Sequence, residues 1–221
     1  VGAGGGLSKT EDSPSNVFAT LNPLDNSYNS TFANGNTSQI SSASDYGWVS
    51  STLGMTSGKF YAECKQTGFS GGSNYNLIGI TSRPLVGTGT TQYLGSQSKT
   101  AGYYGQGNVY VGGSPFSTYA SYTTNDIIGI AIDLDNNKLY FSKNGAWQNS
   151  GNPESGSTGT GALSLTEASD TPLEAYFFAS GDYGNTVIVN NSWNFGNGYF
   201  ANNPVSSAGT NASGNGIFEY D

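Results

Sequence analysis

Residues 125–145, NDIIGIAIDLDNNKLYFSKNG, constrain the fold of this chain more than any other stretch. Ile128, Ile130 and Ile132 fall on alternate positions, which is the period of a strand that buries one face. The run breaks at residues 135–137, where Asp and Asn suit a tight turn. A second alternating run follows and ends at an Asn-Gly pair, which is a strong turn signal. The stretch therefore predicts a β-hairpin.

The composition extends this prediction to the whole chain. The 221 residues include 33 Gly, 15 Tyr and 11 Phe, only 10% of them are charged, and no long stretch carries an apolar stripe at helical spacing. Short apolar runs recur between turn signals, which is typical of a β-sandwich. Besides the hairpin, the predicted strands are 17–24, 30–33, 37–41, 59–65, 75–81, 101–104, 108–111, 162–165, 173–180 and 185–189. We therefore expect an all-β, antiparallel two-sheet sandwich.

The ends of the chain differ in composition from its middle. The first residues are glycine-rich, and the last are rich in Ser, Gly and Asn, as flexible linkers are. A chain that starts without Met and ends abruptly fits a piece of a longer polypeptide. We expect irregular ends around one domain: an N-terminal arm over residues 1–25, the sandwich over residues 26–200, and a polar tail over residues 201–221 that leads out of the domain.

Residue counts exclude several classes of site and partner. The chain has no His, which removes His-based nucleophile systems, His general bases and His-ligated zinc. Its single Cys, Cys64, lies in a predicted strand, where a buried and inert thiol is the better interpretation. With 7 basic residues against 15 acidic ones, the chain lacks the basic patch that nucleic-acid binding requires. No long apolar run indicates membrane insertion.

Four short segments, taken in order, carry a family resemblance. They are 58–63 (GKFYAE), 77–80 (LIGI), 126–145 (from DIIG to FSKNG) and 194–196 (NFG). Together they resemble the SPRY domain, over about residues 55–196. The resemblance implies a bent sandwich of the concanavalin-like, jelly-roll type. It also implies a non-catalytic recognition module whose loops at one end bind a partner.

A looser resemblance concerns the biological setting. The leader SPSNVFATLNPLD, the phrase GMTSGKFYAE and the tail GNGIFEYD are similar to segments of SPRY-containing structural proteins of tailed bacteriophages. In those proteins the module is part of a longer virion protein such as a tail fibre, spike or head appendage. The resemblance implies a virion location, extracellular when mature, with other virion proteins and further copies of the chain as partners.

Two patterns of acidic residues suggest chemical sites. Asp133 and Asp135 with the neighbouring Asn residues offer oxygen ligands for calcium, but they lack the Gly and the bidentate carboxylate of an EF-hand loop. Turn geometry explains them better. Concanavalin-like sandwiches include glucanases, which need two facing carboxylates, and their E-x-D-x-x-E strand motif is absent here. We therefore expect no catalytic residue, no metal site and no cofactor.

Aromatic residues beside turns are the best candidates for ligand binding. Exposed Tyr and Trp rings stack on sugars and anchor protein interfaces. Any one ring is more often a core residue, but the group exceeds what a small core needs. The candidate ligand-binding residues are Tyr93, Tyr103, Tyr104, Tyr110, Tyr119, Trp147 and Tyr183.

These observations together predict a non-enzymatic structural or adhesion module of a virion. We expect it to bind a host-surface glycan or protein through four loops, 83–99, 103–113, 146–171 and 181–185. One alternative is a capsid or tail decoration domain that contacts only virion proteins. Another is a polysaccharide-cleaving enzyme, which needs two carboxylates facing each other across a groove.

Overall fold

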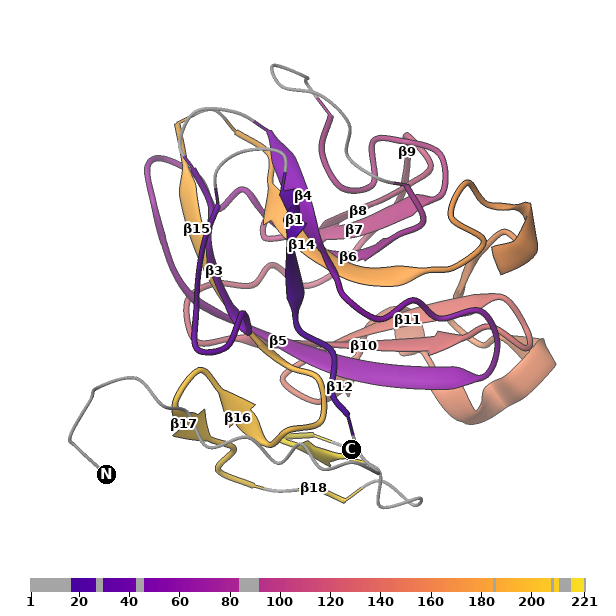
Figure 1. Ribbon diagram of the computed structural model, residues 1–221. Helices are drawn as coiled ribbons and strands as arrows, with labels where there is room; N and C mark the ends of the chain where they lie inside the picture. The colour runs from indigo at the N-terminus through magenta and orange to yellow at the C-terminus, as the bar shows by residue number, and fades with distance from the viewer. Residues whose placement is uncertain are drawn as a thin grey trace.

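The computed structural model describes residues 17–26, 30–42, 46–83, 92–184, 186–207, 209–210 and 216–220. Two large antiparallel sheets lie face to face, and two short ribbons lie beside one of them (Figure 1). The predicted all-β, two-sheet sandwich is therefore confirmed. Most of the predicted N-terminal arm, residues 1–16, lies outside the described residues, as do residues 84–91 of one predicted loop.

The predicted hairpin forms strands β10 (Ile127–Asp133) and β11 (Lys138–Lys143). The two strands pair in continuous antiparallel register. At the turn, Asn137 adopts a left-handed backbone with a φ of 57°. The Asp133 carboxylate accepts hydrogen bonds from the backbone and side-chain amides of Asn136, at 3.1 and 2.9 Å. Asp133 therefore stabilises the turn, as its residue type predicts.

The two sheets are built by pairing strands that are distant in the sequence. The first sheet has the order β1 (Leu21–Asn26), β4 (Gly47–Ser51), β14 (Phe177–Asp182), β6 (Asn76–Thr81), β7 (Thr100–Tyr104), β8 (Asn108–Val111) and β9 (Ser114–Thr118). The second sheet has the order β12 (Ala146–Trp147), β11, β10, β5 (Lys59–Ser70), β15 (Ile188–Asn194), β3 (Ser38–Ile40) and β2 (Thr31–Ala33), and β13 (Leu163–Ser164) also pairs with β11.

The hydrophobic core lies between the two sheets. Alternate residues of β10 and of β6 enter the same buried cluster, and each is at most 1% exposed: Ile128, Ile130, Ile132, Ile78 and Ile80. The period of two that predicted the hairpin therefore buries the expected face. Cys64 is fully buried in this core, as predicted, and burial raises the pKa of its thiol.

The interior also contains a polar cluster that joins the two sheets. The side-chain amides of Asn76 and Asn191 exchange two hydrogen bonds of 2.7 and 2.9 Å. The Ser180 hydroxyl donates to Gln39 at 2.7 Å and accepts from the Trp193 indole at 3.0 Å. Because these buried groups are paired, they fix the position of one sheet on the other without a large desolvation cost.

The sandwich begins earlier than residue 26, the predicted start of the domain. Strand β1 overlaps the predicted arm, yet it pairs with β4 at the edge of the first sheet. The strand predicted over residues 17–24 is accordingly shifted, because β1 runs from Leu21 to Asn26.

The described part of the C-terminal tail returns to the second sheet. Strands β16 (Tyr199–Phe200) and β17 (Asn203–Pro204) form one ribbon, and β18 (Gly209–Thr210) and β19 (Ile217–Phe218) form the other. Figure 1 shows both ribbons below β5. The described tail therefore covers the domain, whereas the sequence predicted that it leads away.

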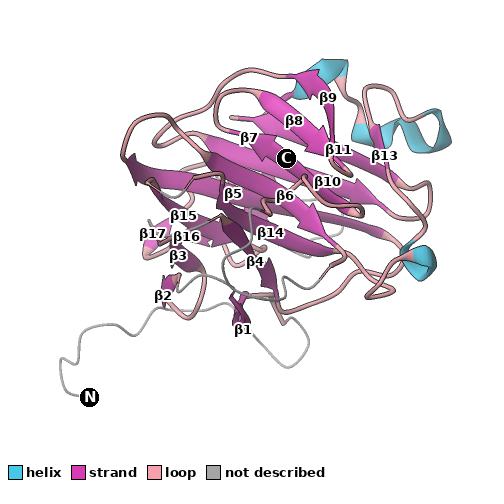
Figure 2. Cartoon of the chain, turned by 90° about the horizontal axis from the view of Figure 1, so that it is seen from above, coloured by secondary structure: helices cyan, strands magenta, loops and turns pink. Residues whose placement is uncertain are grey.

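Other boundaries move because pairing partners decide where a strand ends. The strand predicted over residues 59–65 is longer than expected, since β5 continues to Ser70 by pairing with β15 past a bulge. The strands predicted at 101–104 and 108–111 are confirmed as β7 and β8, which pair as a hairpin. The predicted loop 146–171 contains three short helical turns, which lie on the side of the molecule away from β2 and β3 (Figure 2): η1 (Gln148–Ser150), η2 (Pro153–Thr158) and η3 (Ala168–Asp170).

Candidate functional site

The seven aromatic residues predicted to bind a ligand lie in three separate places. Four converge on the outer face of the first sheet: Tyr93, Tyr104, Tyr110 and Tyr183. Trp147 lies on the second sheet, where it lines a groove. The remaining two, Tyr103 and Tyr119, belong to the core between the sheets.

Tyr103 and Tyr119 are packing residues. Tyr103 is 0% exposed, its ring lies edge-on to that of Tyr119 at 5.3 Å, and its hydroxyl donates to the carbonyl oxygen of Ala120. Burial raises the pKa of Tyr119 to about 12. Residues alternate between the two faces of β7, so Tyr103 points inward where Tyr104 points outward. These two predicted ligand residues are therefore not part of an exposed surface.

Six tyrosines form what we call the tyrosine patch: Tyr46, Tyr75, Tyr93, Tyr104, Tyr110 and Tyr183. Tyr183 is its centre and is 37% exposed. The ring centroids of Tyr46, Tyr75, Tyr93 and Tyr104 lie 5.2, 5.8, 4.4 and 5.9 Å from that of Tyr183. Such tilted and edge-on contacts hold aromatic rings in a fixed arrangement.

The first sheet and one loop together build the tyrosine patch. Outward residues of β6 and β7, Leu77 and Tyr104, form its base with Leu94 from the loop before β7. A side chain at Gly102 would overlap the Leu94 carbonyl oxygen, so this glycine allows the loop to lie against the sheet. The hollow left among the rings is small, about 10 Å³.

The tyrosine patch offers a ligand aromatic ring faces and phenol hydroxyl groups. Among the described residues, none of the six hydroxyls has a hydrogen-bond partner. Burial raises the pKa of Tyr93 and of Tyr104, so both phenols stay protonated at neutral pH and can donate. Protonated phenols beside packed rings can bind an apolar surface and its polar edge together.

Trp147 helps to line a second surface, which we call the sheet groove. The groove has a volume of about 400 Å³ and lies against the outer face of β5 and β10. Its walls are aromatic: the Tyr61 ring lies 4.9 Å from that of Phe218 and 6.3 Å from that of Trp147. The lining residues are Tyr61, Ala131, Trp147, Asn152, Pro153, Glu154 and Phe218, and none of them is cationic.

Glu63 holds the C-terminal wall of the sheet groove in place. Its side chain is 0% exposed and accepts hydrogen bonds from the backbone N–H groups of Glu219 and Tyr220, at 2.8 Å each. The Asn194 amide donates to the same carboxylate at 3.2 Å. Burial raises the Glu63 pKa to about 6, although these hydrogen bonds favour the charged form and lower it. Glu63 thereby positions Phe218 beside the groove.

The described residues offer little for catalysis or metal binding. No three His, Cys, Asp or Glu side chains among them gather closely enough to hold a metal ion. Glu154 is the single carboxylate that lines the sheet groove, whereas glycoside hydrolysis needs a facing pair. In the same part of the chain, no helix has the length and apolar character to cross a membrane.

The fold and the ordered motifs agree with a comparison against protein families. The SPRY domain family matches residues 58–191, which includes three of the four motif segments and more than half of the chain. The chain belongs to the SPRY family. SPRY domains are typically protein–protein interaction modules. A comparison with curated protein sequences found no match.

Solved structures show the same fold at low sequence identity. The SPRY domain of human HERC1 superposes with a TM-score of 0.59 and 18% identity, covering 78% of this chain and 96% of that domain. The structure of stonustoxin superposes with a TM-score of 0.53 and 19% identity, covering 80% of this SPRY chain and 27% of the toxin chain. At these identities the likeness concerns the fold alone.

Sequence reasoning missed several residues of both surfaces. Glu63 alternates with the inward-facing Ala62 and Cys64, a pattern that predicts an exposed side chain, but the tail covers it. Its place on the outer face of a central strand carried no signal that a distant segment would bury it. Tyr75 was interpreted as strand and Phe218 as part of a departing tail, although both line candidate surfaces.

Proposed function

We propose that this SPRY domain is a non-enzymatic recognition module that binds a partner protein through the tyrosine patch. The convergence of six tyrosine rings on one sheet face carries the proposal. Tyrosines with a packed ring and a free hydroxyl are enriched among the residues that dominate interface energies. The hollow of about 10 Å³ is too small for a ligand molecule, so the patch suits a flat protein surface better.

Capture experiments with single-site variants test the patch. Tyr183→Ala removes the central ring and should weaken capture of the partner by roughly tenfold or more. Tyr199→Ala is the matched control, since it removes a half-buried tyrosine of β16 outside the patch. Proteins captured equally by wild type and both variants would contradict the proposal.

We further propose that the domain belongs to a structural protein of a tailed-bacteriophage virion. The similarity of its leader and tail phrases supports this, as does a composition rich in Ser, Thr, Asn and Gly with 10% charged residues. Its partners would then be other virion proteins, further copies of itself, or a host-surface protein or glycan. Antibodies against the domain should label intact particles in electron micrographs, and unlabelled particles would count against a virion location.

The sheet groove favours a second candidate function, the binding of a neutral glycan. Aromatic walls of Tyr61, Trp147 and Phe218 beside the polar side chains of Asn152 and Glu154 match the two faces of a sugar ring. A glycan array should then show ligands that Trp147→Ala loses and Tyr183→Ala retains. An array without ligands would leave the protein partner as the proposed function.

A further inference from the structure

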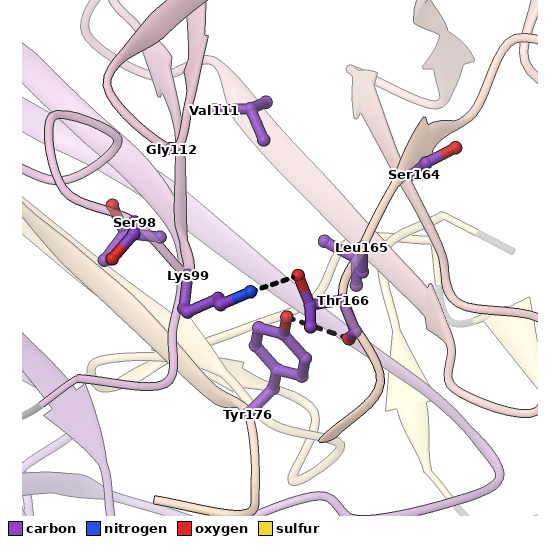
Figure 3. A pocket seen from close by; sticks show the side chains of 9 residues that line it. Ser98, Lys99, Val111, Gly112, Ser164, Leu165, Thr166 and Tyr176 are labelled. Carbon is purple, nitrogen blue, oxygen red and sulfur yellow. Dashed lines mark hydrogen bonds between the residues drawn. The ribbon is translucent and has the colours of Figure 1, made fainter. Parts of the chain in front are cut away.

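A separate cavity of about 170 Å³ lies between elements of both sheets. One side consists of residues 98–100, at the start of β7, and residues 111–112, at the end of β8. The other side consists of Ser164 in β13 and the two residues after it, and Tyr176 completes the lining. Figure 3 shows Lys99 extending from the first side toward Thr166 on the second.

The backbone of Lys99 is strained, and this backbone conformation directs the side chain into the cavity. Its φ of 65° lies in the left-handed region, which is unfavourable for a residue with a side chain. The Thr100 hydroxyl donates to the Gln97 carbonyl oxygen at 2.7 Å, and the Lys99 carbonyl accepts from Ser82 N–H at 2.9 Å, so the turn is fixed on both sides. Strain of this kind persists where the surroundings impose it and often marks functional sites.

The ammonium group of Lys99 has a defined position in the cavity. It donates to the Thr166 hydroxyl at 2.6 Å, and the Tyr176 hydroxyl donates to the Thr166 carbonyl oxygen at 3.0 Å (Figure 3). An ammonium group has three donors, and Thr166 accepts one of them. Two donors remain for a ligand in the cavity.

No carboxylate pairs with Lys99 among the described residues. Lys59 and Lys143, by contrast, pair with carboxylates at 3.4 and 3.1 Å. Glu167 follows Thr166 directly, but its carboxylate accepts from the side chain of Asn137 at 2.6 Å. The nearby Asp170 and Glu174 are exposed, and neither lines the cavity.

A second cation is hydrogen-bonded to a residue that lines the cavity. The Arg83 guanidinium donates to the Ser98 hydroxyl at 3.1 Å. The chain has 7 basic residues and a net charge of −8, so a cavity that holds one cation and has a second bonded to its lining departs from the charge of the chain as a whole. Hydroxyl groups of Ser98, Ser164 and Thr166 supply further hydrogen-bonding groups around it.

We propose that this cavity is a binding subsite for a carboxylate group. The ammonium of Lys99 would take one carboxylate oxygen, and the volume admits a carboxylate with a few carbon atoms. Val111 and Leu165 would contact those carbons. The Lys99 ammonium supplies one positive charge inside the cavity, which matches the single negative charge of a carboxylate better than the two charges of a phosphate dianion. The subsite does not rest on the tyrosine patch or the sheet groove, neither of which includes Lys99.

The carboxylate group can come from an acidic side chain or from an acidic sugar, and paired probes distinguish them. Amide chemical shifts of the isotope-labelled protein would be followed in low salt, where screening is weak. N-acetyl-glutamate N-methylamide and glucuronate are the acidic probes, and N-acetyl-glutamine N-methylamide and glucose are their neutral counterparts. We expect saturable shifts at Lys99, Gly112 and Thr166 with an acidic probe, with a Kd on the order of millimolar. Equal shifts with acidic and neutral probes, or no saturable shift, would overturn the proposal.

A glycine variant separates binding from stability. Lys99→Gly removes the ammonium and suits the backbone φ of 65°, so the variant should unfold at the same temperature or higher. Its affinity for the acidic probe should fall by roughly tenfold or more. Lys65→Met is the control, because it removes one positive charge beside Phe200 and should leave the affinity unchanged. Unchanged affinity in Lys99→Gly, or equal losses in both variants, would show that Lys99 does not form the subsite.

Discussion

The buried carboxyl group of Asp182 should make the protein less stable as the pH rises through neutrality. Asp182 ends β14, is 2% exposed, and its Oδ1 atom has no hydrogen-bond partner. Burial raises its pKa from 3.8 to about 8, against hydrogen bonds from the Ser41 side chain and the Gly184 backbone, which lower it. No cation among the described residues contributes to this shift.

The sign of the effect follows from proton linkage. The folded state holds the Asp182 proton up to about pH 8, whereas the unfolded chain releases it near pH 3.8. The stabilisation is therefore complete below pH 3.8 and is lost progressively as the pH rises to 8. Between these values one proton gives a slope of about −1.4 kcal/mol per pH unit in the free energy of unfolding. From pH 6 to 7.5 the loss should be roughly 2 kcal/mol.

Between pH 6 and 7.5, Asp182 should dominate the pH dependence of the free energy of unfolding. The chain has no His, and Glu63, whose pKa is about 6, contributes mainly below the interval. Urea unfolding, followed by the fluorescence of buried Trp48 and Trp193, gives the free energy at each pH. The free energy of unfolding of Asp182→Asn should stay nearly constant over this interval, whereas that of wild type falls. The exposed control Asp170→Asn should fall as wild type does. Equal slopes in wild type and Asp182→Asn would refute the reasoning.

Three further changes test other parts of the structure. A side chain at Gly181 would overlap the Gly47 carbonyl oxygen on β4, so Gly181→Ala should cost about 1–3 kcal/mol in urea unfolding, and a loss below about 0.5 kcal/mol would contradict this packing. Glu63→Gln replaces with an amide donor one of the two carboxylate oxygens, each of which accepts from one backbone N–H group, so hydrogen exchange at residue 219 or 220 should accelerate roughly tenfold or more, while exchange in β10 stays unchanged. Cys64 is fully buried with a raised pKa, so a thiol reagent should label it at the rate of unfolding, and immediate labelling of the folded protein would contradict the burial.

The sequence predicted a strand correctly where the alternation of apolar residues and the turn residues agreed. The alternation of Ile128, Ile130 and Ile132 and the Asp-Asn turn after them depend on neighbouring residues alone, and the hairpin formed as predicted. The motif segments predicted the SPRY fold for the same reason, since they mark turns and buried faces. Strand boundaries depended on distant partners, which is why β5 extends beyond the predicted strand 59–65 by pairing with β15.

The candidate surfaces were only partly predictable, because side-chain direction and coverage arise from tertiary structure. The sequence alone determined an all-β chain without His chemistry and with many loop aromatics. The tertiary structure decided that Tyr104 and Tyr183 meet on one face while Tyr103 packs inside. It also placed the tail over Glu63. It placed the Lys99 side chain in a cavity that elements of both sheets line. A period of two tells which residues share a face of a strand, but which face is buried depends on segments far away in the chain.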